Sequence, residues 1–208
     1  MVRTANAGIR LSMDDLDILL DGVCHPLYPY LGTPGAIREA LLASPPHAVA
    51  FTHEHPDHYD EAYARLYKEK MRGSFYGPSH FSGGELGNGV RLFAVPTRHI
   101  GKTDIPHVSY CLAGSACVWF MGDASPLELS KMAGLPRPDV LVAPFAYAIT
   151  PLALKKTMET GARELVILHM PPRTADRDGV WPLLPTMPKD GGMRLSVPEP
   201  GEELCFSL

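Results

Sequence analysis

Residues 52–58 read Thr-His-Glu-His-Pro-Asp-His and place His53, His55, Asp57 and His58 within six positions. Imidazole and carboxylate groups are the ligands that suit Zn²⁺ and related divalent ions. Side chains two positions apart in an extended segment point to the same side, so His53 and His55 can meet one ion. The alternative is a run of surface histidines, which the apolar run 48–51 disfavours because it predicts a buried strand that ends where the cluster begins.

Three isolated residues are further candidate ligands because each follows an apolar run that predicts a strand. His99 follows 93–95, Asp123 follows 118–121 and His169 follows 166–168. Each of them, taken singly, has the alternative of an ordinary loop or packing residue. Sites in α/β folds lie at the carboxyl ends of strands, and we therefore expect these three side chains to join the cluster. The candidate metal ligands are His53, His55, Asp57, His58, His99, Asp123 and His169.

The expected elements alternate between strands and helices along the chain. Strands are expected at 8–12, 16–20, 89–95, 108–112, 117–121, 140–143 and 165–168, and helices at 35–43, 61–71, 127–133 and 152–160. The alternation, opened and closed by antiparallel strand pairs, predicts an α/β fold with layers around mixed sheets. Residues 171–192 are rich in Pro, Gly and charge, which predicts a functional loop or a partly ordered flap.

The length and charge of the chain narrow the function classes. A chain of 208 residues suits one compact domain spanning residues 1–208. A net charge of −4 with scattered Lys and Arg gives no basic surface for nucleic acid. The sequence begins without a signal-like segment, and no stretch approaches the ~20 apolar residues of a membrane helix, so we expect a cytoplasmic protein without a membrane partner.

The ordered set 52–58, His99, Gly122-Asp123 and His169 resembles the metallo-β-lactamase superfamily over nearly the whole chain. The resemblance implies a four-layer αβ/βα sandwich, with two mixed sheets flanked by helices and metals in a cleft at one edge between the sheets. Asp21 resembles that family's early aspartate, which supports the metal loop, and a turn aspartate is the alternative.

The resemblance also implies how the ligands divide between two divalent ions. Zinc is the first expectation, and manganese or iron suits the same side chains. The implied first set is His53, His55 and His99, the second set is Asp57, His58 and His169, and Asp123 bridges them. With an aspartate at 123, the motif set is similar to that of the phosphoesterase, thioesterase and lactonase branches of the superfamily. The branch with a Cys-liganded zinc would need a cysteine at this position. The segments 57–59, 121–123 and 169–171 are similar to the small hydrolases that include L-ascorbate-6-phosphate lactonase.

Two divalent ions a few Å apart lower the pKa of a shared water and favour hydrolysis by a metal-bridging hydroxide. The predicted function is therefore a binuclear metal-dependent hydrolase of a small ester, lactone or phosphoester, with Asp57 both a ligand and the residue that orients the nucleophile. The alternative is a non-catalytic metal-binding or sensing domain, which the complete set of ligands disfavours. A nuclease of the same superfamily ranks last because no basic substrate arm is visible.

Several residues beside the ligands are candidates for the wall of a small-molecule site. The substrate-binding candidates are Arg98, Lys102, Tyr147 and Arg173. Arg98 and Lys102 would suit an anion, although ordinary solvent exposure is the alternative for both. His25, Tyr28 and Tyr30 also lie in a loop near the ligands, whereas His107 is expected to be a packing residue. Association into a homo-oligomer is compatible with the sequence, with no copy number implied.

Overall fold

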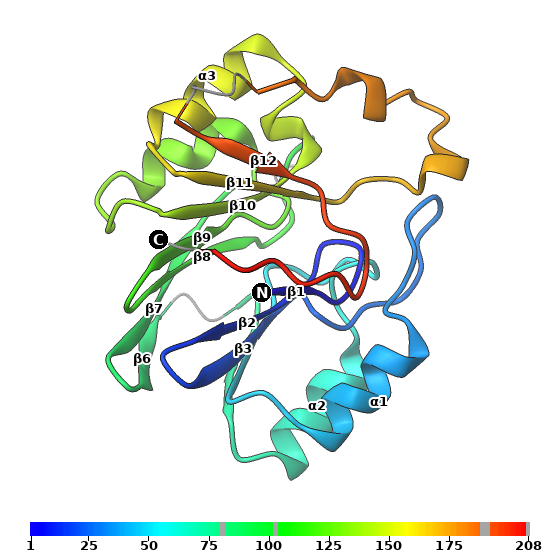
Figure 1. Ribbon diagram of the computed structural model, residues 1–208. Helices are drawn as coiled ribbons and strands as arrows, with labels where there is room; N and C mark the ends of the chain where they lie inside the picture. Colours follow the sequence, from blue (N-terminus) through cyan, green and yellow to red (C-terminus); the bar gives the residue numbers. More distant parts are fainter. Residues whose placement is uncertain (80–81, 102–103, 188–191, 207–208) are drawn as a thin grey trace.

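The computed structural model describes residues 1–79, 82–101, 104–187 and 192–206, which form two β-sheets packed face to face (Figure 1). The first sheet has five strands in the order β1-β2-β3-β4-β5. Their bounds are β1 Val2–Arg3, β2 Ile9–Met13, β3 Leu16–Leu20, β4 Ala48–Ala50 and β5 Ser74–Tyr76. β1, β2 and β3 pair antiparallel, whereas β3, β4 and β5 run parallel, so this sheet is mixed.

The second sheet is also mixed and has seven strands in the order β12-β11-β10-β9-β8-β7-β6. Their bounds are β6 Gly84–Gly87, β7 Val90–Pro96, β8 Val108–Ala113, β9 Cys117–Phe120, β10 Val140–Pro144, β11 Glu164–Leu168 and β12 Arg194–Ser196. β6 to β9 pair antiparallel, and β9 to β12 pair parallel. As a result β7, β9, β10 and β11 all point their carboxyl ends to the same edge of the sheet.

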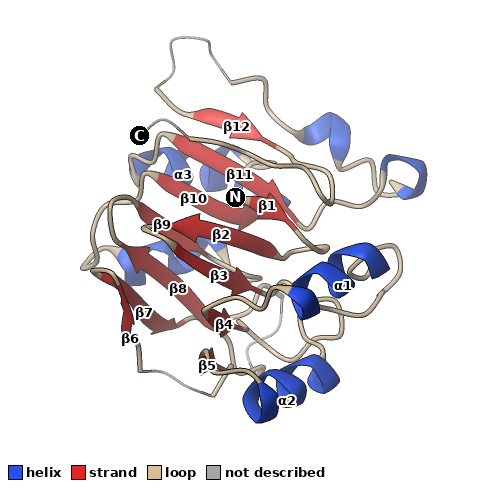
Figure 2. Cartoon of the chain, turned by 60° about the horizontal axis from the view of Figure 1, so that its bottom comes forward, coloured by secondary structure: helices blue, strands red, loops and turns tan. Residues whose placement is uncertain are grey.

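Helices cover the outer face of each sheet (Figure 2). The helices beside the first sheet are α1 (Gly35–Ala43) and α2 (Glu61–Lys70), and those beside the second are η1 (Pro126–Met132), η2 (Phe145–Tyr147) and α3 (Pro151–Glu159). α2 begins at Asp60, whose side chain accepts a hydrogen bond from the Tyr63 backbone N–H and so caps the first turn. Two further 3-10 turns, η3 (Arg173–Ala175) and η4 (Trp181–Leu183), lie between β11 and β12.

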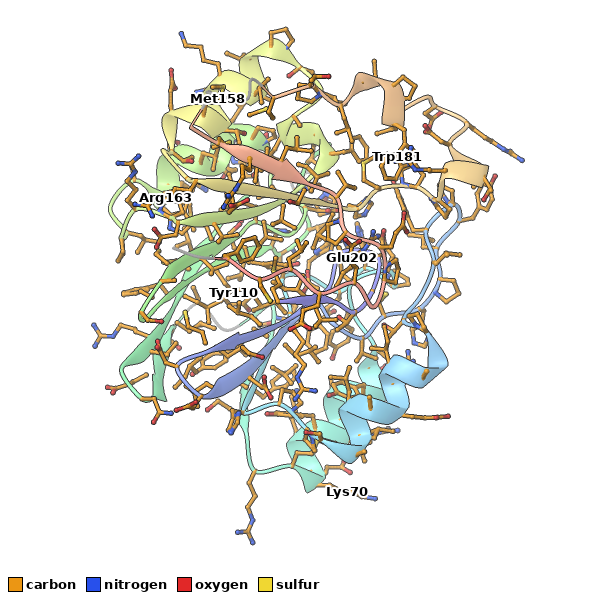
Figure 3. The ribbon with its side chains drawn as sticks, viewed as in Figure 1. Lys70, Tyr110, Met158, Arg163, Trp181 and Glu202 are labelled. Carbon is orange, nitrogen blue, oxygen red and sulfur yellow. The ribbon has the colours of Figure 1, made fainter. Side chains whose placement is uncertain are left out.

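The alternation of side chains along each strand explains why four layers form. In β10, Val140 and Val142 belong to the apolar core between the sheets, whereas Leu141 and Ala143 belong to the core under η1, η2 and α3. A strand that is apolar on both faces must be covered on both faces. Tyr110 lies between the two sheets (Figure 3), and its hydroxyl donates to the Phe51 carbonyl over 2.9 Å. This bond ties the second sheet to the segment that carries the clustered histidines.

The predicted α/β class and the four-layer arrangement of two mixed sheets flanked by helices are confirmed. The opening strand pair is antiparallel as expected, but the closing pair is not, because β12 runs parallel to β11. The expected helix at 127–133 is a 3-10 helix that begins at Pro126. The strands β1, β5, β6 and β12 were not predicted. Within the described ranges, no helix is long and apolar enough to cross a membrane.

Candidate metal centre

All seven candidate ligands gather where the strand ends of the two sheets meet. His53, His55, Asp57 and His58 follow β4, His99 follows β7, Asp123 follows β9 and His169 follows β11. The two sheets are joined at this edge because the Val108 backbone N–H donates to the Thr52 carbonyl over 2.9 Å. The parallel directions of the strands therefore deliver side chains far apart in the chain to one place.

The ligand atoms fall into groups small enough to hold an ion. There are three such sets, and within each set the ligand atoms lie within 4.8 Å of one another. The sets are His53, His55, His99 and Asp123; Asp57, His58 and His169; and Asp21, His53 and His58. The first two sets match the division that the sequence resemblance implied, with Asp123 placed in the first set. The structure thus brings together every predicted ligand, and the third set adds Asp21.

Asp123 faces both predicted sets. One of its carboxylate oxygens, Oδ2, lies 3.4 Å from Nε2 of His58, 3.5 Å from Nε2 of His99 and 3.4 Å from Nε2 of His169. The side chains of His58 and Asp123 are almost completely buried. A carboxylate in this position can contribute an oxygen to each of two ions, as a bridging ligand requires.

Buried ligand atoms without hydrogen bonds show that the side chains fit a cation. Among the described residues, Nε2 of His53, His58 and His99 and Oδ1 of Asp123 are buried and have no hydrogen-bond partner. Leaving one buried polar atom unpaired costs about 1–3 kcal/mol, and four in one cluster are rare in a folded protein. A divalent ion accepts electron pairs from imidazole nitrogen and carboxylate oxygen, and would satisfy all four atoms.

Hydrogen bonds behind the histidines direct their ring nitrogens toward the cluster. Nδ1 of His58 lies 2.9 Å from Oδ2 of Asp21, and Nδ1 of His99 lies 2.7 Å from the Ile100 carbonyl. When Nδ1 donates to an oxygen, the Nε2 lone pair is left for a metal. The same oxygen of Asp21 accepts from the Thr52 hydroxyl over 2.6 Å, and Oδ1 accepts from the Thr52 backbone N–H over 2.7 Å. Asp21 therefore supports the metal loop, as the resemblance implied.

The electrostatics of the cluster favour replacement of a proton by an ion. Burial alone would lower the pKa of His58, but Asp123 and Asp21 outweigh it and raise this pKa well above 6.5. Burial would likewise raise the pKa of Asp123, but His169 and His58 hold it well below 3.8. Burial and the neighbouring His58 lower the pKa of His53 well below 6.5, so its ring is neutral. Without an ion, His58 therefore carries a proton beside the ionised Asp123, and a bound cation would take the place of that proton, whereas His53 already offers a neutral nitrogen.

Two residues outside the predicted ligand set hold the ligands in place. Nδ2 of Asn6 donates to Oδ2 of Asp57 over 3.1 Å, and the backbone carbonyl of Asn6 accepts from the His169 N–H over 3.2 Å. His107 was expected to be a packing residue and is buried, but its Nε2 also accepts from the Asp123 backbone N–H over 3.0 Å. Burial lowers the pKa of His107 to about 3, so the ring is neutral and can accept this hydrogen bond.

The candidate substrate residues have different surroundings. Tyr147 is fully buried and its hydroxyl donates to the Ser125 carbonyl over 3.2 Å, while burial, helped by Asp123, raises the pKa of this phenol. A role for Tyr147 in substrate binding stays a prediction. The Arg98 side chain is exposed, and its backbone N–H donates to Glu128 over 2.9 Å. The Arg173 guanidinium stacks 3.7 Å above the ring centroid of Trp181. Lys102 lies outside the described residues.

Aromatic side chains flank the exposed side of the cluster at His169. The ring centroid of Tyr30 lies 4.1 Å from that of His169 in an edge-to-face arrangement, and that of Phe145 lies 6.4 Å away. Burial, helped by Asp123 and Asp57, raises the pKa of Tyr30 to about 12, so its hydroxyl keeps its proton at neutral pH. The groove of about 920 Å³ along β12 is lined by Arg163, Leu204 and Phe206 among others, and by none of the seven ligands.

Comparison with solved structures identifies the fold as the metallo-β-lactamase fold. YhfI from Bacillus subtilis, a protein of that fold, superposes with a TM-score of 0.54 at 15% identity, over 95% of this chain and 90% of that one. An isothiocyanate hydrolase from Delia radicum gut bacteria superposes with a TM-score of 0.65 at 14% identity, over 99% and 98% of the two chains. A metallo hydrolase from the archaeon Ignicoccus hospitalis gives 0.62 at 14% identity, over 100% and 97%. No family model and no curated protein sequence matches the chain.

Proposed function

We propose that this protein is a hydrolase that works with two divalent metal ions on a small ester, lactone or phosphoester. The observation that carries the proposal is the set of four buried ligand atoms without partners around Asp123. Zinc is the first candidate, and manganese or iron suits the same nitrogen and oxygen ligands. Structures of the same fold that are named as hydrolases support this function class.

His53, His55 and His99 would hold one ion, Asp57, His58 and His169 would hold the other, and Asp123 lies between the two sets. Divalent ions in these positions would lower the pKa of water and polarise the bond that is attacked. Oδ2 of Asp57 accepts a hydrogen bond from Asn6 and contacts His169 at 3.0 Å, so this carboxylate is fixed in orientation. Asp57 stays ionised, because His169 and His58 lower its pKa despite burial, and it can accept a hydrogen bond that orients an attacking water.

One side of the cluster has an uncharged wall. Tyr30 and Phe145, which flank His169, carry no charge. This wall suits the organic part of a small ester or lactone. The cytoplasmic location and any homo-oligomer stay predictions.

Turnover before and after removal of metal tests the proposed function. The metal-loaded protein is assayed on a panel of aryl esters, thioesters, lactones and aryl phosphoesters, and we expect hydrolysis of at least one neutral ester or lactone. A chelator should abolish that turnover, and added Zn²⁺ or Mn²⁺ should restore it. Asp123→Ala should lose the activity while His47→Ala keeps it, because His47 is exposed and lies before β4, at the opposite end of that strand from the ligands. Metal binding without turnover on any panel member would support the alternative of a sensing domain.

A further inference from the structure

The loop from Cys24 to Thr33, between β3 and α1, is held in a defined position beside the metal centre. Its ends are joined because the Thr33 N–H donates to the Cys24 carbonyl over 3.2 Å, and the Cys24 N–H donates to the Thr33 hydroxyl over 2.9 Å. The His25 N–H donates to the Pro56 carbonyl over 2.7 Å, which ties the loop to the segment carrying the clustered ligands. Contacts at both ends therefore fix the loop to the metal centre.

Tyr30 is placed within this loop by two backbone hydrogen bonds. The Tyr30 N–H donates to the Leu27 carbonyl over 2.7 Å, and the Leu27 N–H donates to the Tyr30 carbonyl over 3.1 Å. The Tyr30 side chain is half-buried and packs edge to face on His169. Among the residues that the structure describes, none makes a hydrogen bond with its hydroxyl. The hydroxyl is therefore open to water or to a bound ligand beside His169.

The segment that carries η3 and η4 braces the same loop from the other side. Figure 1 shows this segment, in orange, beside the blue loop that follows β3. The Arg177 guanidinium lies 5.2 Å from the ring centroid of Tyr28. Leu31 and Trp181 line one pocket of about 50 Å³ together with Asn6, the residue that holds Asp57. Trp181, labelled in Figure 3, is itself fixed because its Nε1 donates to the Pro171 carbonyl over 2.8 Å.

We propose that Tyr30 is a catalytic residue whose hydroxyl donates a hydrogen bond to the substrate oxygen on which negative charge develops as the ester or lactone bond breaks. The inference rests on the proposed function and adds a donor from the chain itself beside the metal ligands. A phenol is a good donor, and a fixed donor aimed at developing charge lowers the barrier to hydrolysis. The ring of Tyr30 would also form the wall of the substrate site beside His169. No proton is transferred in this role.

Tyr30→Phe tests the hydroxyl alone, because it removes the hydroxyl and keeps the ring that contacts His169. We expect kcat on the best ester or lactone to fall roughly 10- to 100-fold, as for the loss of one donor to a charged group, with KM and bound metal within about twofold of the native protein. Tyr28→Phe is the matched control, because Tyr28 lies in the same loop but is 67% exposed, and its kinetics should not change. A kcat for Tyr30→Phe within about twofold of the native value would overturn the proposal.

A binding measurement tests Tyr30 without turnover. Phenylphosphonate carries charged oxygens on a tetrahedral centre, as the reacting group of an ester does after attack, and its affinity for the metal-loaded protein can be measured by calorimetry. Tyr30→Phe should weaken that affinity roughly 10-fold, and Tyr28→Phe should leave it unchanged. Equal affinities for native and Tyr30→Phe proteins would contradict the role of Tyr30. A native protein that turns over no panel member would instead contradict the proposed hydrolase, while the phosphonate comparison would still decide whether the hydroxyl contacts a ligand.

Discussion

At the scale of single residues, the metal centre depends on groups behind the ligands as much as on the ligands. Asp21 is completely buried and accepts hydrogen bonds from Thr52 and His58 at the same time. It therefore sets the ring orientation of His58 and, through Thr52, that of His53, whose Nδ1 lies 2.9 Å from the Thr52 hydroxyl. One carboxylate thus orients two ligands that contribute to different predicted ion sites.

Asp21→Asn should weaken metal binding without emptying the site. The amide nitrogen cannot accept a hydrogen bond, so either Thr52 or His58 loses its partner, and loss of such a supporting group typically costs 10- to 100-fold in metal affinity. Competition with a chelator of known affinity measures the change. Asp17→Asn on the same strand is the control, because Asp17 is partly exposed and pairs with Arg10. Unchanged affinity in Asp21→Asn would show that Asp21 has no influence on the ions.

The sequence predicted the candidate metal ligands but not the residues that hold these ligands in place. Imidazole and carboxylate at close spacing indicated a metal site at 53–58, and the ends of predicted strands added His99, Asp123 and His169. Asn6 and His107 act through contacts between loops that are distant in sequence, 51 residues for Asn6 and Asp57 and 16 for His107 and Asp123, and no local pattern reveals them.

At the scale of elements, the site depends on tight turns where strands end. Gly122, between β9 and Asp123, has a φ of +54°, and a Cβ built there would lie 2.6 Å from the Thr52 hydroxyl oxygen. The backbone of Asp123 can turn toward the cluster only because this position has no side chain. Asp21 and His169 also have positive φ, of 46° and 56°. Residues with a side chain rarely adopt this conformation, so backbone strain is concentrated beside the metal ligands.

Gly122→Ala should destabilise the protein and disturb the Thr52 to Asp21 contact. The strained φ and the close approach to Thr52 together should lower the free energy of unfolding by about 1–3 kcal/mol. Urea unfolding of the metal-free protein measures the change. Gly134→Ala is the control, since nothing lies within 4 Å of a Cβ at that position. Equal stability of the two variants would contradict the steric explanation.

The elements that the sequence failed to predict are all short. β1 has two residues, β5 and β12 have three, and β6 has four, of which two are glycines. Each is the outermost strand of its sheet. Runs of this length carry too little hydrophobic periodicity to be recognised, and their strand conformation comes from pairing with a neighbour. β4 is equally short, but β4, β9 and β11, which precede six of the seven ligands, were recognised because they are mostly apolar and buried at every position.

At the scale of the whole molecule, two sheets meet at one edge and each contributes part of a single metal centre. The first sheet supplies the ligands that follow β4 and the supporting Asp21 at the end of β3, and the second sheet supplies His99, Asp123 and His169. The apolar core between the sheets, which includes Ile18, Tyr110 and Val142, fixes their relative position. Solved structures only 14–15% identical share the fold over nearly the whole chain, so the layered core, more than any particular sequence, preserves it.

Native mass spectrometry of the reconstituted protein measures directly whether the seven candidate ligands hold two ions. We expect a mass increase of two divalent ions per chain, reduced in His169→Ala, which leaves Asp57 and His58, with Asp123 beside them, for the second ion. His47→Ala should match the native protein. A native protein that binds fewer than two divalent ions after reconstitution with Zn²⁺ or Mn²⁺, or that binds the same number after His169→Ala and Asp123→Ala, would contradict the binuclear site.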